Sequence, residues 1–124
     1  MSNNVAIIGS NPSLVVGTIG TNGTLSEEFD LGMYTQIGLL SDNASNGTLN
    51  FLVASQPISI NGTLNNTYRL LRDTTGAAVA YTLPAGSSAF KESDMRILAP
   101  YRFVRLLASV AQASAPTFTF VVKG

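Results

Sequence analysis

The sequence contains no histidine, cysteine or tryptophan. Without histidine the common serine and cysteine triads lack their base, and without cysteine no disulfide or thiolate metal site can form. No run approaches the roughly 18 apolar residues of a membrane-spanning helix. Residues 1–4 also lack the basic character of a signal peptide. We therefore expect a protein without catalytic residues, cofactor or metal, made in a cytoplasm and not inserted in a membrane.

Charge is also scarce. Seven Lys and Arg residues balance seven Asp and Glu residues, and charged residues make up 11% of the chain, against about 25% in an average protein. A neutral total gives no bulk attraction to nucleic acid or to an anionic membrane. A sparsely charged surface resists association poorly. The composition thus predicts no nucleic-acid partner and favours a homo-oligomer.

Turn signals are abundant. Asn-Gly-Thr-Leu occurs three times, at residues 22–25, 46–49 and 61–64, each time between apolar runs. Asn-Gly tolerates the positive φ angles of a tight hairpin, and Thr-Leu begins a strand well. We expect three hairpin turns at these places. Their unequal spacing makes them reused turns and not a structural repeat.

Alternating apolar residues between these turns predict an all-β fold. About eight short strands at spacings near 12 residues indicate an antiparallel β-sandwich with a jelly-roll-like arrangement. Residues 24–31 are predicted to form one strand, with Leu25, Glu27 and Phe29 on one face. The predicted core follows the apolar phase of the strands and consists of Phe29, Leu31, Ile37, Leu39, Leu49, Phe51, Val53, Val104, Leu106, Phe118 and Phe120.

The N-terminal segment differs from the rest. We divide the chain into residues 1–16, an N-terminal strand or extended arm, and residues 17–124, a single sandwich domain. Four consecutive apolar residues at 5–8 cannot all face one side of a sheet. The residues predicted to contact a neighbouring subunit are Val5, Ile7, Ile8, Leu14 and Val15. An edge strand of the same sandwich is an equally open interpretation.

Side chains suited to chemistry are few. Glu27 and Glu28 would point to opposite faces of a strand, so they cannot act as a paired acid and base. Asp42 and Asp94 lack the spacing of a calcium loop. Carbohydrate binding would favour exposed aromatic rings, and the four tyrosines are more typical of core or half-buried positions. Glycan binding remains an unsupported alternative.

Several segments together resemble a type of small β-sandwich virion protein found in tailed bacteriophages. An apolar strand ending in Asp-Leu-Gly precedes a core strand, and a late strand carries an aromatic-Arg-aromatic pattern, here with Tyr101. The resemblance covers roughly residues 17–124. The segments that carry it are residues 23–32, 37–40, 48–51, 54–55, 68–76, 98–106 and 117–123.

The resemblance implies a component of the phage particle. The preferred role is a capsid decoration (cement) protein, which would lie on the outer capsid surface, bind the major capsid protein and be made in the host cytoplasm. Because shell lattices offer threefold positions, a trimer is the first expectation for the oligomer. The alternative is a tail or head-fibre accessory protein with a carbohydrate-binding-like sandwich.

Overall fold

A computed structural model describes residues 12–60, 63–64 and 68–124, with side chains for 12–58 and 68–124. In that part of the chain, strands alternate with short connections, and one helical turn and a 3-10 turn follow the tenth strand. The elements are β1 (Ser13–Thr18), β2 (Gly23–Leu25), β3 (Phe29–Asp30), β4 (Gln36–Ala44), β5 (Gly47–Ala54), β6 (Ser59–Ile60), β7 (Thr63–Leu64), β8 (Arg69–Leu70), β9 (Ala80–Leu83), β10 (Gly86–Phe90), α1 (Glu92–Met95), η2 (Arg96–Leu98), β11 (Phe103–Gln112) and β12 (Thr117–Lys123).

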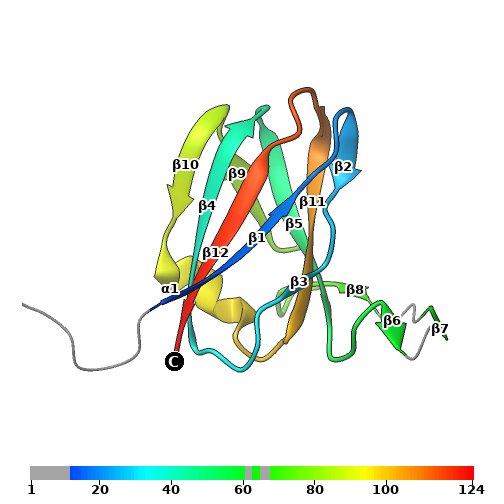
Figure 1. Ribbon diagram of the computed structural model, residues 1–124, viewed down its shortest axis with the longest axis vertical. Coiled ribbons are helices and arrows are strands. Elements are labelled where there is room, and N and C mark those ends of the chain that lie inside the picture. Colours follow the sequence, from blue (N-terminus) through cyan, green and yellow to red (C-terminus); the bar gives the residue numbers. More distant parts are fainter. Residues whose placement is uncertain (1–11, 61–62, 65–67) are drawn as a thin grey trace, which may run out of the picture.

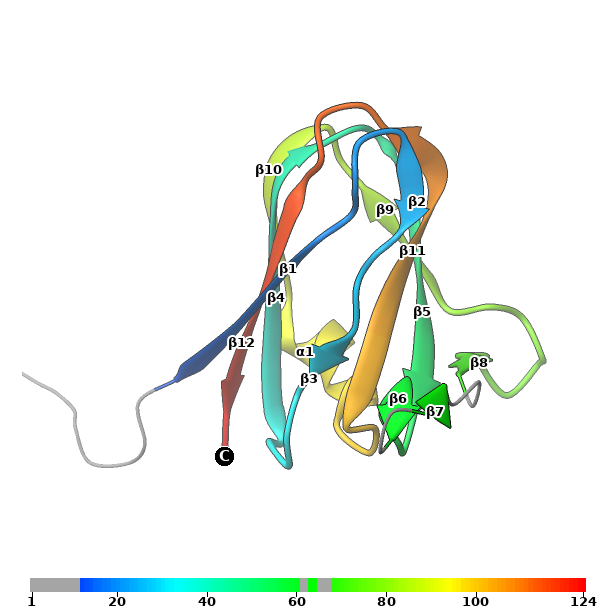
Figure 2. The same cartoon turned by 45° about the vertical axis from the view of Figure 1, so that its right-hand side comes forward.

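Ten of these strands form two antiparallel sheets, which Figure 2 shows as two facing layers. The first sheet has the order β1-β12-β4-β10. The second has the order β2-β11-β5-β8, with β3 also pairing with β11 and β9 also pairing with β5. The short β6–β7 pair stands apart from both layers (Figure 1). The prediction of an all-β antiparallel sandwich is confirmed.

The strand order is that of a jelly roll. Because β2 and β3 share the partner β11, they fill one strand position, and β8 and β9, which share β5, fill another. Without the separate β6–β7 pair, the described strands then occupy eight positions. These run 1-8-3-6 in the first sheet and 2-7-4-5 in the second, which is the double Greek key of a jelly roll. The sequence had predicted about eight strands of this type.

The core lies between the two layers. All eleven residues predicted for it are buried, with exposures of 6% or less. Phe29 and Phe120 bridge the layers with ring centroids 4.9 Å apart in an edge-to-face arrangement. Met95 of α1 and Leu98 of η2 are fully buried and extend the core. The predicted burial of these eleven residues is therefore confirmed.

The prediction of one continuous strand over residues 24–31 is wrong. The chain pairs as β2, breaks, and pairs again as β3, and Ser26 is buried while Leu25 and Glu27 are exposed. The Ser26 hydroxyl accepts a hydrogen bond from the Leu106 backbone N–H (2.7 Å) and donates one to the Glu27 carbonyl (2.8 Å). An inward-facing serine whose hydroxyl makes these two hydrogen bonds thus interrupts the predicted alternation of buried apolar and exposed polar residues.

The Asn-Gly-Thr-Leu copies turn the chain, but two of them do not close hairpins. Asn22 has φ 62°, and the Gly23 N–H donates to the Gly20 carbonyl at 2.9 Å. This turn leads from β1 to β2, which belong to opposite sheets. Gly47 likewise begins β5 after β4, again across the two sheets. Only the third copy lies within a paired hairpin, β6–β7, and its first two residues are outside the described residues.

β1 crosses the predicted boundary between residues 16 and 17. It pairs antiparallel with β12 over its whole length, from Ser13 opposite Val122 to Thr18 opposite Thr117. Leu14 and Val15 therefore belong to an edge strand of the sandwich. Val5, Ile7 and Ile8 lie outside the described residues. In the part of the chain that is described, no helix is long and apolar enough to cross a bilayer.

Candidate interaction surface

The outward side of the β1–β12–β4–β10 sheet is the candidate interaction surface. One row of residues crosses all four strands: Val16 lies opposite Thr119, Thr119 opposite Leu40, and Leu40 opposite Ala89. Because side chains alternate along a strand, these four point away from the core-facing Phe118 and its neighbours. The row contains no charge and is mostly apolar.

A second row lies two residues further along the strands, where Leu14 is opposite Val121 and Val121 is opposite Gly38. Leu14, Val16 and Leu40 are exposed, by 64%, 57% and 42%, and Val121 is half-buried. We call the two rows together the neutral face. It consists of Leu14, Val16, Gly38, Leu40, Ala89, Thr119 and Val121.

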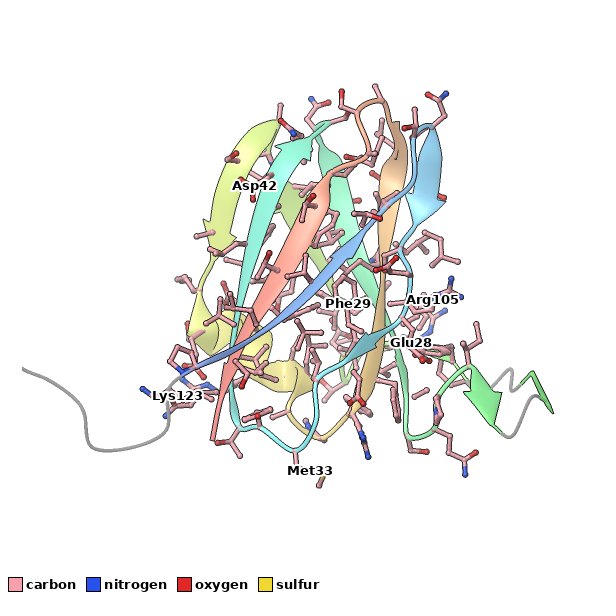
Figure 3. All side chains as sticks on the ribbon, in the orientation of Figure 1. Glu28, Phe29, Met33, Asp42, Arg105 and Lys123 are labelled. Atoms are coloured by element: carbon pink, nitrogen blue, oxygen red, sulfur yellow. The ribbon has the colours of Figure 1, made fainter. Side chains whose placement is uncertain are left out.

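Charge is confined to two opposite ends of this sheet. Among all residues of its four strands, only Asp42 and Lys123 are charged. Asp42 lies opposite Thr117, and Lys123 lies opposite Gln36, six residues away along the ladder. Figure 3 shows the two side chains at the two ends of the sheet. A contiguous uncharged, accessible sheet surface is typical of a protein–protein contact.

Beside the second sheet, charged side chains pair with other groups of the chain. Arg102 donates to both carboxylate oxygens of Asp30, at 2.9 and 3.0 Å. These hydrogen bonds hold the pKa of Asp30 below its usual value. The guanidinium of Arg102 also lies 5.1 Å from the ring centroid of Phe103.

Beside it, one carboxylate ties a loop to the sheet. Oε2 of Glu28 accepts hydrogen bonds from the Tyr68 hydroxyl and from the Ile58 backbone N–H, both at 2.6 Å. Burial, and next the bond to Glu28, raise the pKa of Tyr68. Arg105 lies 6.0 Å from the Tyr68 ring centroid and donates from Nε to the Ser26 carbonyl. Figure 3 shows Glu28 and Arg105 close together on this side. These groups are engaged within the chain, unlike the neutral face.

One hollow bears on the glycan alternative. It lies beside β9 and β10, has a volume of about 400 Å³ and is lined in part by Tyr81, Phe90, Lys91 and Asp94. The Tyr81 hydroxyl donates to the Asp94 carbonyl at 3.3 Å, and burial raises the pKa of Tyr81. All four tyrosines are half-buried, as predicted. Within the described residues, no group of three or more metal-binding side chains comes together.

Of the predicted contact residues, only Leu14 and Val15 are described, and they behave differently. Leu14 is part of the neutral face, whereas Val15 packs against the core. The sequence analysis missed Val16, Leu40 and Val121. A signal was present, because Val15-Val16, Leu39-Leu40 and Val121-Val122 are adjacent apolar pairs within strands, and only one member of each pair can face the core.

The chain was compared with known proteins. No family model matches it, and no curated protein matches it. Among solved structures, it is similar to the SPBc2 prophage-derived protein YomS, at 12% sequence identity and a TM-score of 0.47, over 95% of this chain and 100% of that one. A similarity at this level assigns no function, so the proposals below rest on this chain's own surface.

Proposed function

We propose that the chain is a structural protein of a bacteriophage particle that decorates and stabilises the assembled capsid, without catalysis. The observation that carries this is the neutral face, an accessible sheet surface with its only charges at its two ends. The jelly roll supports it by analogy, since viral capsid domains use this architecture. The sequence resemblance to phage virion β-sandwiches points the same way.

The mechanism is one of mass action. A protein that binds only the assembled lattice lowers the free energy of that lattice at every occupied site. Many copies on one shell add their contributions, even where each contact is weak. The proposed partners are the major capsid protein and further copies of this chain, on the outer capsid surface. The trimer expected from lattice symmetry is one candidate for the oligomer and a two-fold dimer is the other, and sedimentation of the free protein distinguishes them.

Copy number tests this proposal. Quantitative mass spectrometry of purified particles of the phage that encodes the chain should find it in hundreds of copies. Particles lacking it should release their genome at a lower temperature, and adding back the purified protein should restore the wild-type midpoint. Absence of the chain from purified particles would overturn the proposal.

The tail or head-fibre alternative is supported by one observation, the hollow beside Tyr81 and Phe90. Aromatic rings next to polar groups suit a sugar. A handful of copies per particle, together with glycan-array binding that Phe90→Ala abolishes, would favour this alternative over capsid decoration.

A further inference from the structure

Nothing described within the chain requires a glycine at position 38. It lies inside the nine-residue strand β4, where glycine weakens a strand. Its φ is outside the left-handed region, and a Cβ added to it would approach no atom closer than 3.9 Å, an ordinary contact. A strand glycine without an internal reason often marks a place where another chain approaches closely.

The surface around Gly38 is hollowed. A depression of about 320 Å³ is lined in part by Gly38, Val121, Gln36 and Lys123. Glu92 also borders it and is paired with Arg96 at 3.4 Å. Leu40 stands beside this hollow, two residues along the same strand, and is 42% exposed. The neutral face thus carries a protruding leucine and a recess roughly 7 Å apart.

We propose that the neutral face pairs with the neutral face of a second copy about a two-fold axis. The axis runs between the neutral faces of the two copies. It crosses the strands midway between the rows of Leu40 and Gly38. This rotation places Leu40 of each copy over the hollow at Gly38 of the other. It also places Val16 over Leu14 of the second copy, so that apolar side chains meet across the contact.

The same axis brings opposite charges together. Asp42 and Lys123 lie three residue positions along the ladder from the axis, on opposite sides, so the rotation sets Asp42 of one copy against the end that carries Lys123 in the other. Each contact occurs twice, as an isologous interface requires. Two stacked sheets normally pack about 10 Å apart with strands crossing at about 30°. The second copy therefore fits both the shape and the charge of the face.

The size of the face predicts a weak contact. Four strands about 4.8 Å apart and some 20 Å of strand length give roughly 400 Å² per copy. A stable interface usually buries about 800 Å² per partner. Association should therefore require high concentration in solution, and a shell that holds many copies close together would favour it. In this respect the inference rests on the proposed function, although its test does not need the particle.

The test combines sedimentation velocity from about 10 µM to 1 mM with one substitution that fills the hollow. Wild type should pass from monomer toward dimer, and Gly38→Val should weaken association by about tenfold or more. Its thermal midpoint should not fall, because the added side chain has room. The matched control is Thr82→Val, on the exposed side of β9 in the other sheet, which should associate like wild type.

A charge exchange gives a second readout if Gly38→Val fails to fold. Lys123→Glu should weaken association, and the double variant Lys123→Glu/Asp42→Lys should restore it. In this cysteine-free chain, Thr119→Cys should also cross-link with a short bismaleimide, whereas Thr82→Cys should not.

Several outcomes would overturn the pairing. These are a wild type that stays monomeric to 1 mM, a trimer, or a dimer that Gly38→Val leaves unchanged in an otherwise folded protein. A protein with one of these outcomes could still bind capsids. If Leu40→Lys abolishes that binding, the neutral face contacts the capsid protein instead of a second copy. In that case the pairing fails while the decoration proposal stands. A protein that forms the dimer but does not bind particles would overturn the decoration proposal and leave the pairing standing.

Discussion

Ser41 occupies a position that suits an apolar residue better. It is 1% exposed, and its hydroxyl has no hydrogen-bond partner among the described residues. We expect Ser41→Ala to raise the free energy of unfolding by about 1 kcal/mol, because a buried polar atom without a partner carries its full desolvation cost. Urea unfolding of the two proteins measures this directly.

Ser26 provides the matched control. Its hydroxyl is equally buried but makes two hydrogen bonds, to Leu106 and Glu27. Ser26→Ala leaves the buried Leu106 N–H without that acceptor and should lower the free energy of unfolding by about 1–3 kcal/mol. Equal destabilisation by both substitutions would show that the Ser41 hydroxyl is satisfied after all.

Tyr68 should make stability depend on alkaline pH. Burial and the hydrogen bond to Glu28 raise its pKa, so the folded chain keeps the phenol proton at pH values where the unfolded chain loses it. This contribution is complete below the unfolded value of about 10 and is lost as the pH rises above it. The unfolding free energy should therefore fall less steeply above pH 10 in Tyr68→Phe than in wild type. Equal slopes would contradict the prediction.

The burial of apolar core residues could be predicted from the sequence, whereas the burial of polar residues such as Ser26 could not. Phe51 and Leu106 follow a two-residue period, and burial of one face explains them fully. The inward direction of Ser26 depends on the Leu106 N–H, 80 residues away. No local pattern contains a partner at that distance. The predicted core includes Leu39 but says nothing of its outward neighbour Leu40, so the neutral face was missed.

At the scale of elements, the pairing of β1 with β12 predicts how the protein responds when residues 1–12 are removed. Deleting residues 1–12 should leave the thermal midpoint of the free protein nearly unchanged, because all six residue pairs between β1 and β12 remain. The same deletion should weaken attachment to particles if Val5, Ile7 and Ile8 contact a neighbouring subunit by strand addition. Differential scanning calorimetry and particle co-sedimentation measure the two effects.

A truncated protein that unfolds would show that this segment belongs to the sandwich. An unchanged affinity for particles would remove the contact role of Val5, Ile7 and Ile8.

The positions of the turns could be predicted from the sequence better than the strands that the turns connect. Asn22 takes the positive φ that its residue type allows, so the place of the bend was readable locally. Which strands the bend joins depends on the Greek-key order, since β1 and β2 lie in different sheets. That order is set by packing of the whole chain, and a four-residue motif carries no information about it.

At the scale of the whole molecule, the jelly roll joins distant parts of the sequence. β1 pairs with β12, and β2 and β3 pair with β11, so the strands nearest the two ends must meet before either sheet is complete. Closing such long loops costs entropy before the contacts form. We expect folding in milliseconds to seconds or slower, measured by stopped-flow fluorescence of the tyrosines. Folding in microseconds would contradict this topology.

The pairing of β1 with β12 also determines how the molecule would respond to a pulling force. Ser13 and Val122 lie opposite each other at the same end of this antiparallel ladder. A load applied through residues 13 and 122 would pull the two strands apart from that end and break their hydrogen bonds one after another. A load spread over the neutral face would instead act across the whole sheet at once. A protein anchored by its ends would therefore peel open easily, whereas one held by its face would resist a load of the same size.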